Sequence, residues 1–101
     1  MAERKPTVGG NWKMNLHRDE ATALATTLAE RFKASDKVEM TICPAFPYLL
    51  PVAELIASKN SAIRVGAQDV YTQPNGAFTG EVSWSMLQDV GVKVVIVGHS
   101  E

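Results

Sequence analysis

The sequence lacks the residues and spacings that several classes of site require. It holds one cysteine, Cys43, which excludes an intramolecular disulfide and any paired-cysteine metal or redox site. His17 and His99 are the only histidines and no HExxH occurs, so we expect no metal site. Neither GxGxxG nor GxxxxGK followed by Ser or Thr is present, which argues against a dinucleotide or nucleotide site. We therefore expect no cofactor.

The charge and the apolar runs exclude two kinds of partner. The net charge is -1 and no basic block recurs along the chain, so nucleic-acid binding has no electrostatic basis. No apolar stretch is long enough to cross a bilayer. Residues 1–6 carry charge with no apolar segment behind them, so we expect no secretory leader and a cytoplasmic location. A length of 101 residues allows one domain at most.

Short apolar segments alternate with helical patterns along the chain. The apolar segments begin near Val8, Val38, Ile63 and Val94, and they are typical of strands buried on both faces of a parallel sheet. Helical spacing lies between them, over about residues 17–33, 47–59 and from 79–83 to Gly91. This order predicts an α/β fold, β-α-β-α-β-α-β, whose four strands are parallel and joined by right-handed crossovers.

Each predicted helix has a face that we expect to be buried. Pro47 and Pro51 must lie before the second helix or in its first turn, because proline cannot donate a backbone hydrogen bond. The apolar residues that recur on the expected inner faces are Leu24, Leu28 and Phe32 with Ala21 and Ala25 alongside, then Leu55 and Ile56, then Trp84, Leu87 and Val90.

Polar side chains follow the first and fourth strands, where parallel folds gather their site residues. Lys13 and His99 can meet at that edge, and a fixed cation beside a hydrogen-bond donor stabilises an oxyanion formed next to a carbonyl. Taken one at a time, these residues have ordinary interpretations. Lys13 can be a solvated surface charge, His99 a hydrogen-bonded structural residue, and Asn11 a turn residue. Glu101 is equally compatible with a site role and with a disordered terminus.

Five segments together resemble the triosephosphate isomerase family. Residues 11–15 (NWKMN) follow the first strand, and residues 98–101 (GHSE) follow the fourth. The other three are residues 43–47 (CPAFP), 66–69 (GAQD) and 76–81 (GAFTGE). The resemblance covers essentially the whole chain in order, and it implies the first half of a TIM (β/α)8 barrel. On this basis residues 1–101 form a single incomplete barrel domain.

The resemblance implies a role for each matching residue. His99 would be the catalytic imidazole that polarises the substrate carbonyl and moves protons between its two oxygens. Lys13 would be catalytic and substrate-binding, Asn11 would orient Lys13 and the substrate, and Glu101 would support Lys13 without touching substrate. The implied reaction interconverts dihydroxyacetone phosphate and glyceraldehyde 3-phosphate in glycolysis and gluconeogenesis, without metal or cofactor. The implied assembly is a homodimer, in which Thr79 reaches the partner's site and Met14 helps to form the receiving pocket.

The catalytic glutamate base, the lid and the phosphate loops of the family fall outside this sequence. We therefore expect a fragment that is inactive by itself, because proton abstraction without its base loses most of its acceleration. The alternative is a non-catalytic half-barrel that self-associates or complements a C-terminal half. Four strands cannot close a barrel, so we expect the two sheet edges and the inner face of the sheet to stay open, which favours association.

Overall fold

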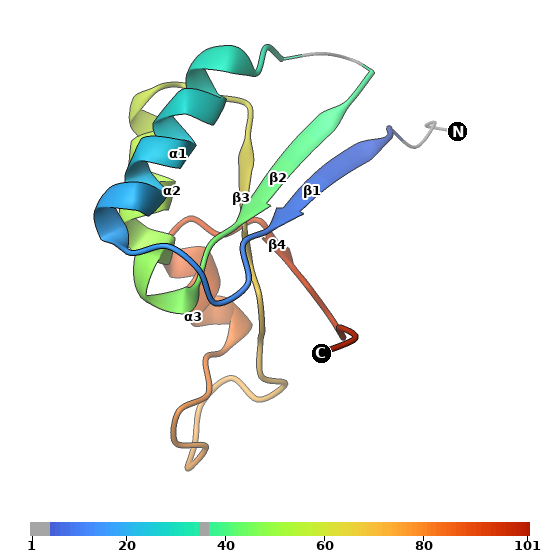
Figure 1. The fold of residues 1–101 in the computed structure, drawn as a ribbon. Helices are drawn as coiled ribbons and strands as arrows, with labels where there is room; N and C mark the ends of the chain where they lie inside the picture. Colours follow the sequence, from blue (N-terminus) through green and yellow to red (C-terminus); the bar gives the residue numbers. More distant parts are fainter. Residues whose placement is uncertain (1–4, 35–36) are drawn as a thin grey trace.

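The computed structural model describes residues 5–34 and 37–101. The expectation that the chain has no secretory leader concerned residues 1–6, and most of these lie outside the described residues. The centre of the structure is a sheet in the order β1-β2-β3-β4 (Figure 1). The strands are β1 (Thr7–Asn11), β2 (Glu39–Cys43), β3 (Arg64–Ala67) and β4 (Val94–Val95). Every neighbouring pair is parallel, which confirms the predicted α/β fold with four parallel strands.

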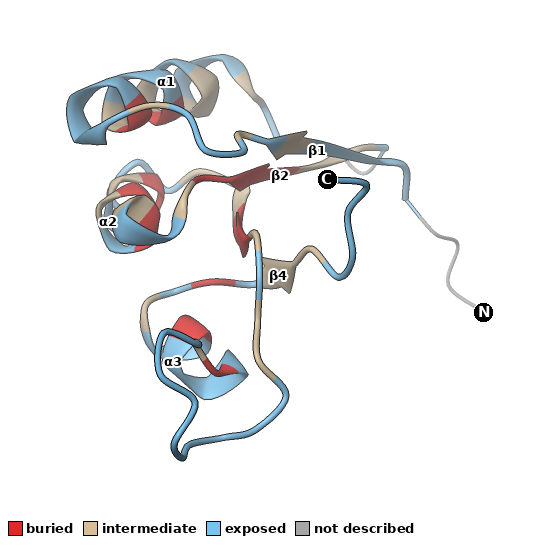
Figure 2. Cartoon of the chain, turned by 60° about the horizontal axis from the view of Figure 1, so that its bottom comes forward, coloured by how far each residue is buried: buried red, intermediate tan, exposed pale blue. Residues whose placement is uncertain are grey.

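All the helices lie on the same face of the sheet (Figure 2). They are α1 (Arg18–Arg31), the short 3-10 helix η1 (Phe46–Tyr48), α2 (Leu49–Ser58) and α3 (Trp84–Asp89). Helices follow β1, β2 and β3 in turn, as expected of strands joined by crossover connections. In the described part of the chain, no helix is both long enough and apolar enough to cross a membrane.

Helix α1 begins and packs for identifiable reasons. Asp19 and Glu20 occupy its first turn, and the Glu20 carboxylate accepts a hydrogen bond from the His17 backbone N–H at 3.1 Å. Both carboxylates also suit the positive end of the helix dipole. The buried positions are Ala21 and Ala25, whereas Leu24 is exposed. The prediction that Leu24 faces the core is therefore wrong, because the buried stripe runs along the alanines beside it.

The other two helices match their predicted positions with one correction. Pro47 lies in η1 and Pro51 lies in the first turn of α2, as proline geometry requires. Helix α3 starts after Ser83, whose hydroxyl accepts a hydrogen bond from the Met86 backbone N–H at 3.3 Å. With only 6 residues it completes less than two turns, and Leu87 is its one buried residue. Trp84 is exposed, so its predicted core position is wrong.

Helices cover only one face of the sheet in the described part of the chain (Figure 2). Val8 in β1 is 54% exposed, and both residues of β4 are only half-buried. The edge strands are therefore not buried on both faces, which agrees with the expectation that half a barrel leaves its sheet edges and inner face open. On the face without helices, Thr41 and Cys43 of the inner strand β2 are nevertheless buried. The core lies between sheet and helices and consists mainly of Ile42, Val65, Leu49, Val52 and Ile56.

Strands β2 and β3 pack so closely that β3 needs a glycine at residue 66. A methyl group built on Gly66 would lie 2.7 Å from the Cys43 sulfur and 3.1 Å from Cγ2 of Thr41. Such a contact is shorter than van der Waals packing permits, so neighbouring atoms would have to move.

We predict that Gly66→Ala lowers the free energy of unfolding by about 1–3 kcal/mol, because it overpacks the face that carries Cys43. Urea unfolding followed by circular dichroism measures the change. Gly9→Ala is the matched control, since nothing lies within 4 Å of a methyl group at Gly9. We expect the control to change stability by no more than about 0.5 kcal/mol. Equal effects of the two substitutions would refute the packing argument.

Candidate functional site

The loop after β1 positions the first two polar residues. The backbone N–H of Trp12 donates to the Cys43 carbonyl at 3.1 Å, which holds the start of this loop against β2. The Asn11 side-chain oxygen then accepts a hydrogen bond from the Lys13 backbone N–H at 2.9 Å. Lys13 has a φ of 55°, in the left-handed region that few residues other than glycine adopt. The chain thus turns sharply at Lys13.

The segment after β4 brings the remaining predicted residues to the same place. The backbone N–H of Ile96 donates to the Ala67 carbonyl at 2.9 Å and extends the pairing with β3. Gly98 then adopts a φ of 75°, a turn that glycine makes without steric cost. Beyond this turn the Glu101 carboxylate reaches both Lys13 and His99. It lies 2.8 Å from the Lys13 ammonium and 3.5 Å from Nδ1 of His99.

These side chains line an open hollow of about 430 Å³ at the carboxyl ends of the strands. Met14 stands at its edge and is 94% exposed. Thr79, predicted to lie at a subunit interface, is exposed and does not line this hollow. The residues that form the lining are Asn11, Lys13, Met14, Gln68, Asp69, His99 and Glu101.

Sequence reasoning missed Gln68 as a site residue. Its side-chain N–H group donates to the Lys13 carbonyl at 2.8 Å and to the Cys43 carbonyl at 2.9 Å. Asp69, its neighbour, also lines the hollow. Its place in the sequence could have identified it, because Gln68 directly follows strand β3 just as the predicted site residues follow β1 and β4.

Lys13 and Glu101 each stabilise the charged form of the other. The hydrogen bond to Glu101, and then its negative charge, raise the pKa of Lys13 above its ordinary value. The same hydrogen bond is the main reason why the pKa of the Glu101 carboxyl lies below its ordinary value. Lys13 is therefore a fixed cation and Glu101 a fixed anion at neutral pH. Elsewhere, burial raises the pKa of the Cys43 thiol, which favours its protonated form.

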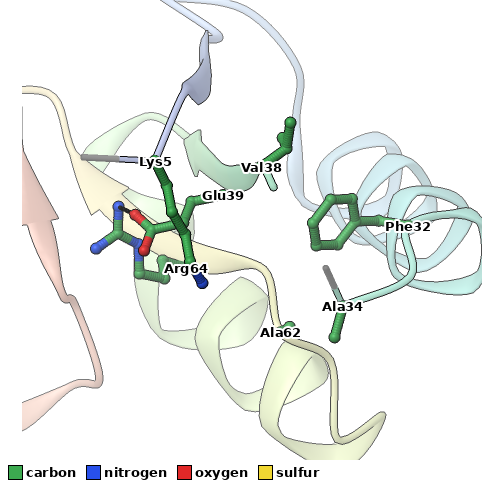
Figure 3. Close-up of a pocket in the computed structure, with 7 residues that line it drawn as sticks. All are labelled: Lys5, Phe32, Ala34, Val38, Glu39, Ala62 and Arg64. Atoms are coloured by element: carbon green, nitrogen blue, oxygen red, sulfur yellow. Dashed lines mark ion pairs between the residues drawn. The ribbon is translucent and has the colours of Figure 1, made fainter. Parts of the chain in front are cut away.

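A second hollow, of about 410 Å³, lies at the opposite ends of the strands (Figure 3). Arg64 and Glu39, at the starts of β3 and β2, form an ion pair at 2.9 Å there, and Lys5 stands beside them. Both partners of the pair are partly exposed, so it contributes little to stability. Within residues 5–34 and 37–101, no group of three or more His, Cys, Asp or Glu side chains could hold a metal ion.

The first hollow combines a permanent cation, an imidazole and side-chain amides in a solvent-open site. Such a set can attract a small anionic molecule and stabilise negative charge on one of its oxygens. The parallel strands lie in consecutive order with the helices on one face, which is the arrangement of part of a (β/α)-barrel protein rather than of an open sheet with helices on both faces.

The chain belongs to the triosephosphate isomerase family, because the family model described as triosephosphate isomerase matches residues 6–101. It is 48% identical over 98 residues to the triosephosphate isomerase of Carboxydothermus hydrogenoformans, covering 97% of this chain and 38% of that protein. Identity to the protein of the same name from Rhodopirellula baltica is 42%, with the same shares covered. The protein of that name from Alcanivorax borkumensis is 48% identical, with 97% and 37% covered. The chain spans under two fifths of the length of these curated relatives.

We predict that Glu101→Gln moves the pKa of Lys13 down toward its ordinary value, because the substitution removes the carboxylate that raises it. A side-chain NMR titration of Lys13 measures this shift. Glu81→Gln, at an exposed glutamate of the loop before α3, is the matched control and is expected to leave Lys13 unchanged.

The pH dependence of the ion pair follows from the two shifts. Its stabilising effect is fully present above the ordinary pKa of glutamate and below that of lysine. It is lost as the pH falls through the lowered pKa of Glu101, or rises through the raised pKa of Lys13. An ordinary pKa for Lys13 in the unsubstituted chain would contradict the pairing with Glu101.

Proposed function

We propose that residues 1–101 are one incomplete barrel domain, the N-terminal part of a triosephosphate isomerase. The complete protein interconverts dihydroxyacetone phosphate and glyceraldehyde 3-phosphate, a step of glycolysis and gluconeogenesis. The observation that carries this proposal is the convergence of Asn11, Lys13 and His99 on one hollow in a chain of this family. The proposal keeps the cytoplasmic location expected from the sequence.

The geometry suits each residue to a step of that reaction. Removal of a proton beside a carbonyl places negative charge on the carbonyl oxygen, and a permanent positive charge nearby stabilises it. Lys13 supplies this charge, and the phosphorylated triose is itself an anion that Lys13 attracts. His99 faces the same hollow and donates a proton to, or accepts one from, the substrate oxygens. Asn11 holds the Lys13 backbone through its side-chain oxygen.

The proposal assigns proton abstraction to a part of the protein beyond these residues. The family resemblance places the glutamate base, the lid and the phosphate-binding amides after the fourth strand. The hollow seen here is open to solvent, whereas charge stabilisation is strongest in a site that excludes water. We therefore expect residues 1–101 to show no isomerase activity when expressed alone.

We predict that His99→Gln, in the full-length protein that contains this segment, lowers kcat by about 100-fold or more, because proton transfer at the substrate oxygens is lost. A coupled assay with either triose phosphate measures the rate. His17→Gln is the control, since the His17 side chain is 92% exposed and lies at the start of α1. A full-length protein with no isomerase activity, or equal rates for the two variants, would refute the proposal.

The complete protein is proposed to be a homodimer. The segment between β3 and α3 includes a long extension that projects from the body of the structure (Figure 1). Tyr71 and Phe78 pack within this extension, with ring centroids 4.6 Å apart. Exposed Thr79 belongs to the same segment, and exposed Met14 stands at the edge of the hollow, so both are available to a second copy of the chain.

The alternative is a non-catalytic half-barrel, and the exposure of apolar side chains at the open edges of the sheet is the observation that favours it. Val97 is 83% exposed and Val8 is 54% exposed. We predict that residues 1–101 self-associate, because an exposed apolar face and open strand edges promote pairing. Analytical ultracentrifugation measures the mass distribution. A monodisperse monomer that melts cooperatively would contradict association, and turnover restored by an added C-terminal half would favour the enzyme.

A further inference from the structure

The backbone conformation of Lys13 needs support from its surroundings. A φ of 55° brings the Cβ atom of an L-residue close to its own backbone, at a cost of about 1–2 kcal/mol. Leu16, three residues later, also has a positive φ, of 73°. A loop with two such residues keeps its shape only where neighbouring groups hold it.

Two side-chain amides hold Lys13 from opposite sides of its backbone. The Asn11 side-chain oxygen accepts from the Lys13 N–H at 2.9 Å, and the Gln68 side-chain nitrogen donates to the Lys13 carbonyl at 2.8 Å. Asn11 is only two residues from Lys13, so any movement of the loop would move both residues together. Gln68 is 55 residues away in sequence and follows β3, so of these two side chains it is the one that ties the Lys13 backbone to a part of the sheet outside the loop.

The side-chain nitrogen of Gln68 donates two hydrogen bonds. Its NH2 group has two hydrogens, which go to the carbonyls of Lys13 and Cys43. The Cys43 carbonyl also accepts from the Trp12 N–H. One side chain therefore links the loop after β1 and the end of β3 to the end of β2. Glutamate and methionine have nearly the same length as glutamine, but neither has an N–H to donate.

We propose that Gln68 is a positioning residue, which holds the Lys13 backbone in its left-handed conformation so that the ammonium group faces the hollow. In this conformation the Lys13 ammonium lies 2.8 Å from the Glu101 carboxylate. The catalytic consequence of this inference rests on the proposed isomerase function. The structural consequence does not, because it concerns the conformation of Lys13 alone.

The kinetic test compares Gln68→Met and Gln68→Glu with the unsubstituted full-length protein. We expect kcat/KM for glyceraldehyde 3-phosphate to fall by about 10- to 100-fold, because a small displacement of a charged group strongly reduces catalysis. KM should rise and kcat should fall, since Lys13 acts on both the bound substrate and the developing charge. Gln88→Met, at an exposed glutamine of α3, is the matched control and should leave both constants unchanged.

A structural readout separates this inference from the proposed function. Crystal structures of the same proteins give φ at Lys13 and the distance from its ammonium to Glu101. We expect Gln68→Met to lose the positive φ or the 2.8 Å contact while the sheet remains intact. If Gln68→Met does not fold, Gln68→Asn, which keeps the amide on a shorter side chain, provides the same comparison.

The outcomes differ for the two ideas. An unsubstituted full-length protein without isomerase activity refutes the proposed function, and the crystal structures still test the role of Gln68. An unchanged Lys13 conformation in the Gln68 variants overturns the inference, and so do unchanged kinetic constants in an active enzyme. A loss of stability without a change in KM, kcat or Lys13 geometry would show that Gln68 is only a structural residue.

Discussion

The parallel pairing of neighbouring strands is the constraint on which the rest of this structure depends. Asn11 pairs with Cys43, and the pairing of Ile42 with Val65 brings the end of β3 to the same edge. Because all strands run in one direction, the loops that follow them emerge together at that edge. The hollow that contains Lys13 and His99 is a consequence of this register. Among the described residues, the opposite edge of the sheet carries the Arg64–Glu39 ion pair with Lys5 beside it.

A second requirement is that the loops hold a geometry that the backbone disfavours. The left-handed turn at Lys13 points a long, flexible side chain back over the sheet edge, where Glu101 meets it. An ion pair between exposed groups is weak by itself, so it cannot impose this turn. The hydrogen bonds from Asn11 and Gln68 act on the backbone instead, where each restricts the torsion angles directly. The hydrogen bonds to the Lys13 backbone therefore determine where its ammonium group lies, and Glu101 favours the protonated form of that group.

Sequence patterns predict most of the fold and only part of the site, for physical reasons. Apolar runs and helical spacing depend on neighbours in the chain, so the sequence predicts the alternation of strands and helices and a third helix that begins near residues 79–83. Burial depends on what covers a surface, which explains the errors at Leu24 and Trp84. The roles proposed for Asn11, Lys13 and His99 came from family resemblance. Gln68 was missed because its partners are backbone carbonyls, and a sequence does not show which carbonyls lie within reach.

The one-sided burial and the open hollow have a common origin. A closed barrel would cover the inner sheet face with strands that continue the same parallel order, and it would surround the hollow with further loops. Gly66, packed against Cys43 and Thr41 on that inner face, shows that the strands are already adjusted to close packing there. Hydrogen bonds within residues 11–68 hold the Lys13 backbone between the side chains of Asn11 and Gln68. The loop at Lys13 is thus organised by this segment alone, while enclosure of the charge requires additional chain.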